Sequence, residues 1–148
     1  MGSRDGQELG GGTLTESDLV QALKKFVKGL LPFAIFIKLA DRFNSGYPDV
    51  TVTWRGITSW WELKHYDNEA FKSPELQETR CKQLGEQGIC HYVIYEERKG
   101  VRRTLIVAPK DMDHWEQTNN WAPGFDHTFV VNFIRQCHLY PEQFKPAA

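Results

Sequence analysis

The sequence predicts one α/β domain in which helices flank a central mixed β-sheet. Apolar residues recur at helical spacing in two segments, residues 14–31 and 126–138. Short runs rich in β-branched and aromatic residues predict strands at residues 33–39, 49–54, 59–64, 89–96 and 103–108. A third helix, expected at residues 75–86, separates the third strand from the fourth, so the order is α-β-β-β-α-β-β-α. The 148 residues suffice for one domain with a sizeable core.

Capping residues and prolines set the expected helix boundaries. The first helix starts with a capping box, formed by Thr13 with Glu16 or by Thr15 with Asp18, and it ends at Pro32. The helix at residues 75–86 follows a proline, which is favoured in the first turn of a helix, and it ends near a glycine. A short helix is expected at residues 109–115.

Polar turns are expected to connect the strands. The second and third strands form a β-hairpin with residues 55–58 as its turn, and residues 98–101 join the fourth and fifth strands. The polar stretch at residues 65–72 is expected to be a loop.

Composition excludes several classes of protein. Hydrophobic residues make up 41% of the chain and charged residues 25%, which is ordinary for a soluble globular protein. No apolar run approaches the ~20 residues that cross a membrane, and the N-terminus has no apolar signal-peptide segment. The three cysteines do not suggest a disulfide framework, so we expect a location in a reducing cytoplasm.

Net charge argues mildly against a nucleic-acid-binding protein, because the formal value is −1. The distribution of charge softens this argument. Residues 98–110 contain five basic residues and no acidic residue. A locally basic strip can bind phosphates even in a chain that is nearly neutral.

Two carboxylates and one amine are expected to meet within the predicted hairpin. Asp49 opens the second strand, and Glu62 and Lys64 lie on the third. Because side chains alternate faces along a strand, Glu62 and Lys64 share one face, while Trp61 and Leu63 take the other. Two acidic groups beside an open position suit a hard divalent ion, with Mg²⁺ as the default. An ammonium next to that ion suits a phosphate or an activated water. The alternative is an ordinary exposed Glu–Lys pair on an edge strand.

This arrangement resembles the catalytic motif of the PD-(D/E)xK nucleases. The surrounding sequence is most similar to the virus-type replication-repair (VRR) nuclease branch, which is related to Holliday-junction resolvases. The resemblance covers roughly residues 14–109 and rests on three stretches: Ser45-Gly46-Tyr47-Pro48-Asp49, Trp61-Glu62-Leu63-Lys64 and Ser73-Pro74-Glu75-Leu76-Gln77. It implies a restriction-endonuclease-like core at residues 13–110. The Gly-rich and polar composition of residues 1–12 separately predicts a disordered tail. Residues 111–148 would then be a C-terminal helical extension of the same domain.

The resemblance also implies roles for individual residues. Asp49 and Glu62 would be metal ligands, the backbone carbonyl of Leu63 would also face the ion, and Lys64 would orient the attacking water. Mn²⁺ would substitute for Mg²⁺. Two further residues match less specific parts of the pattern. Glu16 corresponds to an acidic ligand on the first helix, although a capping role explains it equally well, and it is expected on the apolar face of that helix. Gln77 corresponds to a glutamine that lies near the metal site or the DNA backbone.

Basic residues in two places are candidates for binding DNA phosphates. Lys38 and Arg42 precede the loop that carries Asp49, although ordinary surface placement is at least as good an explanation. Arg98, Lys99, Arg102 and Arg103 flank the predicted turn at Gly100 and could lie along a nucleic-acid backbone. Alternatively, these residues place charge at the tip of the hairpin and so protect the protein from aggregation.

The function expected from these residues is a metal-dependent DNA endonuclease that hydrolyses phosphodiester bonds. The resemblance implies a branched substrate (a Holliday junction, a flap or other branched DNA), a homodimer, and an origin in a prokaryote or a phage-infected cell. One rival function is a catalytically inactive nucleic-acid-binding module on the same fold. Another is a generic α/β interaction domain, which the near-neutral charge permits.

Overall fold

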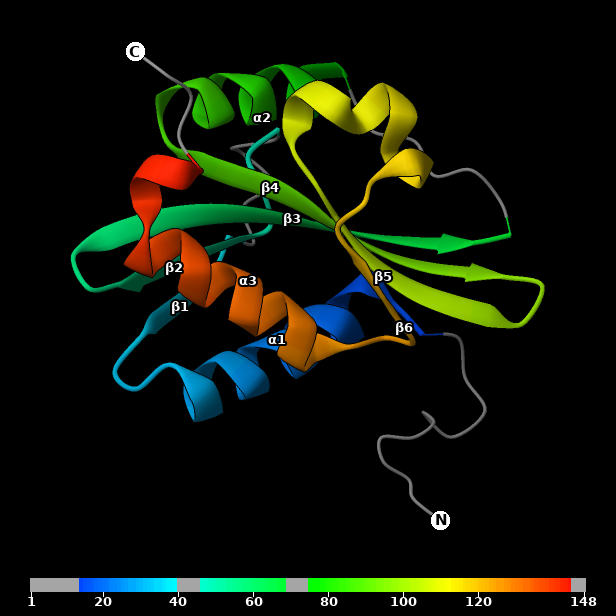
Figure 1. The fold of residues 1–148 in the computed structure, drawn as a ribbon, viewed down its shortest axis with the longest axis horizontal. Coiled ribbons are helices and arrows are strands. Elements are labelled where there is room, and N and C mark those ends of the chain that lie inside the picture. Colours follow the sequence, from blue (N-terminus) through cyan, green and yellow to red (C-terminus); the bar gives the residue numbers. More distant parts are fainter. Residues whose placement is uncertain (1–13, 40–45, 69–74, 145–148) are drawn as a thin grey trace.

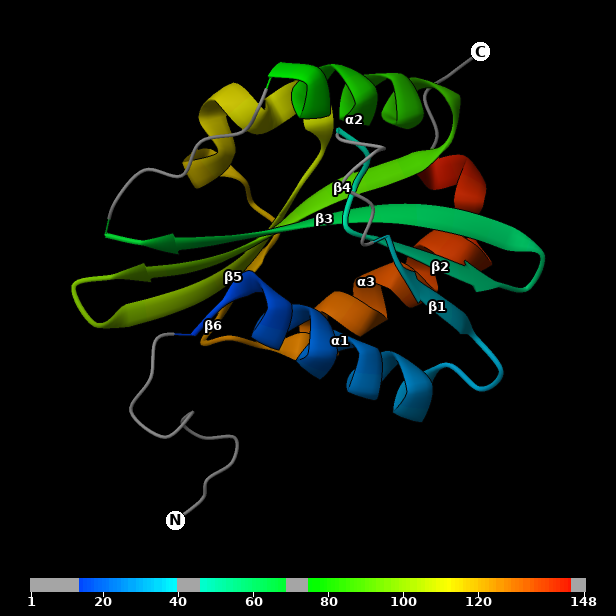
Figure 2. The same cartoon turned by 180° about the vertical axis from the view of Figure 1, so that it is seen from behind.

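A six-stranded mixed sheet covered by helices forms the core of the protein (Figures 1 and 2). This computed structural model describes residues 14–39, 46–68 and 75–144. The strands lie in the sheet in their sequence order: β1 (Ile35–Lys38), β2 (Val50–Trp54), β3 (Ile57–Asp67), β4 (Ile89–Arg98), β5 (Val101–Val107) and β6 (Trp121–Pro123). All neighbouring pairs are antiparallel except β3 and β4. That parallel pair needs a crossover connection, which α2 (Glu75–Gln87) supplies.

Helices cover both faces of the sheet, so the α/β fold with a mixed sheet that the sequence predicts is confirmed. Helices α1 (Glu16–Leu30) and α3 (His127–Leu139) lie side by side on one face. Helix α2 and the 3-10 helix η1 (Pro109–Gln117) lie on the other (Figure 2). A second 3-10 turn, η2 (Pro141–Gln143), follows α3. None of the helices in the described ranges is long and apolar enough to cross a membrane.

Strict alternation of side chains divides the interior into two apolar layers. The layer beneath α1 and α3 takes Trp61 and Leu63 from β3 and Val93 from β4. The layer beneath α2 and η1 takes Tyr92 and Ile94 from the same β4 strand. A strand that is buried on both faces must carry apolar residues at nearly every position. This requirement explains why residues 89–95 contain so few polar side chains.

Both β-hairpins close with turns of two residues, which are shorter than the predicted turns. In the β2–β3 turn, Arg55 and Gly56 have φ values of 56° and 79°. In the β4–β5 turn, Lys99 and Gly100 have φ values of 52° and 79°. Two consecutive positive φ values are typical of the type I′ turn, whose twist matches that of antiparallel strands. The β2–β3 turn takes only Arg55 and Gly56, whereas residues 55–58 were expected to form it. Strand β3 therefore starts at Ile57, two residues earlier than predicted.

The structure corrects the sequence prediction at two other places. Residues 65–67 were expected in a loop but continue β3, because β4 extends beside them and Asp67 is in register with Glu97. A short strand, β6, was not predicted at all. Its three residues include a proline and pair only with β5, so neither length nor alternation marks them as a strand.

Helix α1 begins with the second of the two predicted capping boxes. The Thr15 hydroxyl accepts a hydrogen bond from the Asp18 N–H at 3.1 Å, and Asp18 accepts one from the Thr15 N–H at 3.0 Å. The alternative cap, Thr13, and the proposed N-terminal tail lie outside the described residues. Glu16 lies on the same face of α1 as the buried Leu19 and Leu23, as its spacing predicts, and although its side chain is exposed at the first position of the helix it reaches the His65 N–H of β3.

A buried polar chain ties the end of α3 to the β2–β3 hairpin. One ring nitrogen of His138, Nδ1, donates to the Trp54 carbonyl at 2.9 Å, which leaves Nε2 to accept from the Ser59 hydroxyl at 2.8 Å. The Trp61 indole N–H then donates to the same hydroxyl at 2.7 Å. Ser59 and His138 are almost completely buried and their hydrogen bonds are internal, so this Ser–His pair holds the fold together.

Acid is expected to destabilise the protein through His91 on β4. Its ring stacks on Trp61 with centroids 5.5 Å apart, and its Nδ1 atom is buried without a hydrogen-bond partner. Burial lowers the pKa of His91 to about 4. The unfolded chain therefore takes up a proton near pH 6.5, whereas the folded protein does so only near pH 4. Stability conferred by the neutral ring is complete above about pH 6.5 and is lost as the pH falls, by up to about 3 kcal/mol.

The measurement is urea unfolding between pH 4 and pH 8 for the wild type and for His91→Leu. We expect a shallower loss of unfolding free energy below pH 6.5 in the variant. Burial also lowers the pKa of His127 and of His138, so part of the acid sensitivity should remain. Parallel curves for the two proteins would contradict the prediction.

Candidate active site

The candidate site lies beside the part of β3 that extends beyond the first residue of β2 and has no β2 partner. Val50, the first residue of β2, is in register with Trp61, so β3 runs on past the end of β2. Two acidic side chains take the place of the missing strand. The Leu63 N–H donates to Asp49 Oδ2 at 3.0 Å, and the His65 N–H donates to Glu16 Oε2 at 3.3 Å. The gap beside β3 is thus lined by carboxylates from the start of β2 and the start of α1.

Glu62 and Lys64 sit on the α2 face of β3, at the same level as this gap. Lys64 Nζ lies 3.3 Å from Glu62 Oε2, and Glu62 Oε1 accepts the Asp49 N–H at 3.0 Å. The two residues are only 2% and 6% exposed. The alternative of an exposed pair on an edge strand is therefore wrong, because β3 lies inside the sheet between β2 and β4. Asp49, Glu62 and Lys64, from two separate strand regions, form one connected group.

Charge in this group is unbalanced. Burial raises the pKa of Glu62, the negative charge of Asp49 also raises it and Lys64 opposes both effects; together they bring the pKa of Glu62 to about 9. Burial also raises the pKa of Asp49, against the hydrogen bond from the Leu63 N–H and the charge of Lys64. Two carboxyl groups thus share one ammonium in a poorly hydrated place, and without a cation Glu62 keeps its proton at neutral pH. A bound cation would take the place of that proton and favour the ionised form of Glu62.

The oxygen donors at the gap fit a magnesium ion. The N–H and C=O of one strand residue point to the same side, so the Leu63 carbonyl faces the gap together with Asp49. A carbonyl and two carboxylates are hard ligands, and Mg²⁺ keeps several of its own waters when it binds a protein. Asp49 and Glu62, with the Leu63 carbonyl, are the residues that would hold the ion.

Glu16 is near this group but does not complete a metal site. Among the described residues, no three His, Cys, Asp or Glu side chains converge as a group that could hold a metal ion. Glu16 is instead engaged with the His65 N–H, one β3 residue beyond Lys64. Its assignment as a third ligand stays a prediction, and the site described here has two carboxylates.

Lys38 places a cation at the mouth of the gap. It ends β1, and its Nζ atom lies 3.4 Å from Ser17 Oγ in the first turn of α1. Its positive charge is close enough to lower the pKa of Asp49, although burial outweighs it. Lys38 is exposed, so a phosphate that approaches Asp49 can reach it. The other basic candidate of this region, Arg42, lies outside the described residues.

Gly46 allows the loop that carries Asp49 to pass close to α2. Its φ is +98°, a conformation that other residues rarely adopt. A Cβ atom there would lie 2.8 Å from Leu76 Cγ and 2.9 Å from Arg80 Cδ, both on α2. The glycine of the motif therefore has a structural reason for its place three residues before the aspartate.

An aromatic and arginine column stands beside the site, and the sequence analysis did not find it. The guanidinium of Arg80 lies over the Tyr47 ring at 4.5 Å from its centroid, and that ring is 6.2 Å from the ring of Trp60. The column links α2 to the loop just before Asp49 and to β3 just before Glu62. A signal was present, since an aromatic residue flanks each acid in the sequence, but Arg80 is one of several charged residues on α2.

Gln77 occupies the expected helix. It is half-buried in the first turn of α2, four residues before Cys81, so both side chains lie on one helix face. Cys81 is buried against β4 and is close enough to Glu62 to affect its pKa. The inner face of α2 thus brings Gln77 to the same side of the sheet as Glu62 and Lys64.

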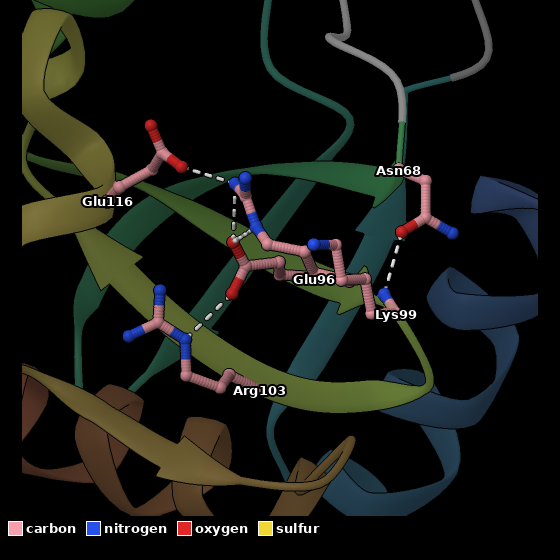
Figure 3. Close-up of polar contacts among 6 residues, drawn as sticks. Asn68, Glu96, Lys99, Arg103 and Glu116 are labelled. Atoms are coloured by element: carbon pink, nitrogen blue, oxygen red, sulfur yellow. Dashed lines mark hydrogen bonds and ion pairs between the residues drawn. The ribbon is translucent and has the colours of Figure 1, made fainter.

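The arginines of the β4–β5 hairpin are already engaged with acidic residues. Glu96, which is 3% exposed, accepts hydrogen bonds from Arg103 at 2.7 Å and from Arg98 at 3.1 Å (Figure 3). Arg98 also pairs with Glu116 of η1. These contacts clamp the hairpin to η1 and leave less positive charge for a phosphate than the sequence suggests.

Of the other two basic residues of the hairpin, Arg102 pairs with an acidic residue, whereas Lys99 is held through its backbone. Arg102 pairs with Glu97 at 3.0 Å and lies over the Phe125 ring. The backbone N–H of Lys99 donates to Asn68 at 2.7 Å, while its side chain is exposed (Figure 3). The sequence does not reveal this neutralisation, because Glu96 and Glu97 precede the basic strip and only the antiparallel register brings them opposite Arg103 and Arg102. A role for the hairpin in binding DNA stays a prediction.

Comparison with known proteins adds no relative. No protein-family model matches the chain, and no curated protein is significantly similar to it. The interpretation of the site therefore rests on its own residues and geometry.

Proposed function

We propose that the protein is a metal-dependent DNA endonuclease with a restriction-endonuclease-like core. The observation that carries the proposal is the connected group of Asp49, Glu62 and Lys64 beside the gap in the sheet. Burying two acids and a lysine together costs several kcal/mol of desolvation unless hydrogen bonds or a ligand offset it. Such groups cluster at functional sites. The order of these residues along the chain is the one that the PD-(D/E)xK resemblance describes.

In this proposal the residues of the chain divide the work of hydrolysis. Asp49, Glu62 and the Leu63 carbonyl would hold Mg²⁺ or Mn²⁺. When bound, the ion lowers the pKa of a coordinated water and neutralises charge on the phosphate. The Lys64 ammonium leaves its pairing with Glu62, holds the attacking water and offsets the charge that develops on the phosphate oxygens. Exposed Lys38 positions a phosphate at the mouth of the gap.

The proposed substrate is branched DNA, and the proposed assembly is a homodimer. Both follow from the resemblance to the VRR nucleases and to Holliday-junction resolvases. Affinity for DNA should be modest and should fall steeply with salt.

Cleavage of a labelled DNA panel tests the proposal. The panel contains linear duplex, single strand, flap, fork and four-way junction, each incubated with Mg²⁺, Mn²⁺ or EDTA. We expect metal-dependent cuts that fall at least about 10²-fold in Lys64→Met, since positioned proton-transfer and electrostatic groups contribute factors of this size. Lys82→Met, which changes an exposed lysine on α2, is the matched control and should cut like the wild type.

One observation favours an inactive DNA-binding module as the rival function. Glu62 and Lys64 are bound to each other and nearly buried, which would suit a structural ion pair as well as a catalytic one. The same panel separates the two functions. Binding of branched DNA at low salt without cuts under any metal would favour the module, and cuts unaffected by Lys64→Met would contradict the proposed site.

A further inference from the structure

Exposed apolar side chains are concentrated in one short stretch of the chain. Large apolar residues that are exposed in the described structure include five between residues 26 and 37: Phe26, Leu30, Phe33, Ile35 and Ile37. Phe33 is fully exposed and has a φ of 67°, and Ile35 and Ile37 are 56% and 47% exposed. Isolated exposed apolar residues are normal, but Ile35 and Ile37 are two residues apart on one strand, so their exposed side chains lie together on one face of β1, whereas Phe26 and Leu30 belong to α1.

This stretch includes β1, an edge strand with little protection against pairing. At the opposite edge of the sheet, β6 has only three residues and ends in Pro123, which cannot donate a backbone hydrogen bond. The β1 strand, Ile35-Phe36-Ile37-Lys38, has no proline, and its outer side is unpaired among the described residues. Three of its four residues, Ile35, Phe36 and Ile37, have high β-propensity. The two edge strands thus differ: the proline of β6 hinders pairing with a further strand, whereas β1 has no proline.

We propose that β1 pairs with β1 of a second copy of this chain, in antiparallel orientation about a two-fold axis. The pairing would join two six-stranded sheets into one continuous sheet. A second copy fits this edge because the strand is complementary to itself. If the axis passes beside Phe36, Ile35 lies opposite Ile37 of the partner subunit, and Ala34 lies opposite Lys38 of the partner subunit.

The side chains support this register. Phe36 packs into the layer beneath α1 and α3, so Ile35 and Ile37 project from the opposite face of the sheet. The two-fold axis brings two isoleucines from each copy together on that face. The only charged residue of the strand, Lys38, meets a small residue, so no like charges face each other. A strand of four residues gives a small interface, and the dimer should dissociate on dilution.

The register also fixes the separation of the two candidate active sites, a consequence that rests on the proposed function. Lys38, at the mouth of each site, ends β1. Strand geometry then puts the two Lys38 Cα atoms about 15 Å apart, from ~3.4 Å per residue and ~5 Å between strands. Two sites this close would cut opposite strands of a bound DNA only a few base pairs apart.

Sedimentation velocity over a range of protein concentrations tests the interface. We expect the full-length chain to shift from one to two copies as concentration rises, and Ile37→Lys to remain a monomer with an unchanged circular dichroism spectrum. Val101→Lys is the matched control, because Val101 is 65% exposed on β5 and the same charge there should leave the dimer intact. A wild type that stays monomeric throughout the range, or an Ile37→Lys variant that still dimerises, would overturn the proposal.

A charge-swap experiment tests the register itself. Ile35→Lys and Ile37→Glu should each be monomeric alone, because each homodimer would place two charges against isoleucines. Mixed together, they should form a heterodimer in which the new lysine faces the new glutamate and the remaining isoleucines face each other. A mixture that stays monomeric would overturn this register. Cleavage assays are independent of the result, since a monomer that still cuts DNA would leave the proposed nuclease standing.

Discussion

Replacing Glu62 with glutamine is expected to abolish metal-dependent cleavage and, at the same time, to stabilise the metal-free protein. The carboxylate is nearly buried beside Asp49, and burial together with that neighbouring charge raises the pKa of Glu62 to about 9. A neutral amide of the same shape removes the repulsion. It also removes a metal ligand, so cleavage should fall by at least about 10³-fold if the ion supplies several kcal/mol of transition-state stabilisation.

The stability effect has a defined dependence on pH. Because the folded-state pKa of Glu62 lies above its ordinary value of 4.5, the folded protein binds a proton that the unfolded chain releases. Stability is complete below about pH 4.5 and declines as the pH rises toward 9, by about 3 kcal/mol at neutral pH. In EDTA, Glu62→Gln should therefore unfold at a higher temperature than the wild type, and the difference should grow from pH 5 to pH 8.

Added Mg²⁺ should reverse the order of stability. An ion that binds only the folded wild type raises its melting temperature, whereas Glu62→Gln should respond weakly. The matched control is Glu86→Gln, which changes an exposed glutamate on α2 and should behave as the wild type. Differential scanning calorimetry in EDTA and in Mg²⁺ gives both results. A destabilised Glu62→Gln in EDTA would show that the carboxylate serves the fold, and the metal site would then lose its main support.

Replacing Glu96 with glutamine is expected to destabilise the protein by about 2 kcal/mol, the loss typical of removing hydrogen bonds to a charged group, because the arginines left behind are partly exposed. Glu96 is 3% exposed and accepts hydrogen bonds from both Arg98 and Arg103 (Figure 3). An amide accepts with only one oxygen, and its N–H₂ group would face an arginine. The clamp between the β4–β5 hairpin and η1 would then open from one end.

Glu97→Gln provides the comparison for this change. Glu97 is the next residue on β4, but its pair with Arg102 is more exposed, so the loss should be about 1 kcal/mol or less. Urea unfolding at neutral pH measures both variants. Burial opposes ionisation of Glu96, yet the hydrogen bonds from Arg103 and Arg98 lower its pKa. The stability that Glu96 adds is therefore present above about pH 4.5 and is lost below it, so the two variants should converge in acid. Equal losses at neutral pH would contradict this account.

Much of the fold could be predicted from local patterns. The apolar spacing in α1 and α3 and the β-branched runs in β2, β4 and β5 identify these elements within a few residues, because each buries one face or both faces of a regular structure. Alternation on β3 was enough to place Glu62 and Lys64 opposite Trp61 and Leu63. The sequence predictions failed where a neighbouring strand decides the structure. Strand β6 forms only by pairing with β5, and β3 continues to Asp67 only because β4 lies beside it.

The sequence by itself determined which residues form the candidate site, because strand alternation and the acid-lysine spacing are local properties. Only the tertiary structure decided how those residues act on one another. It places Asp49 and Glu16 along the open side of β3, and it encloses Glu62 and Lys64 beneath α2. It also brings Glu96 and Glu97 opposite the arginines that looked like a basic strip. Charge pairing, burial and the protection of sheet edges depend on residues far apart in the chain, and periodicity carries no information about such contacts.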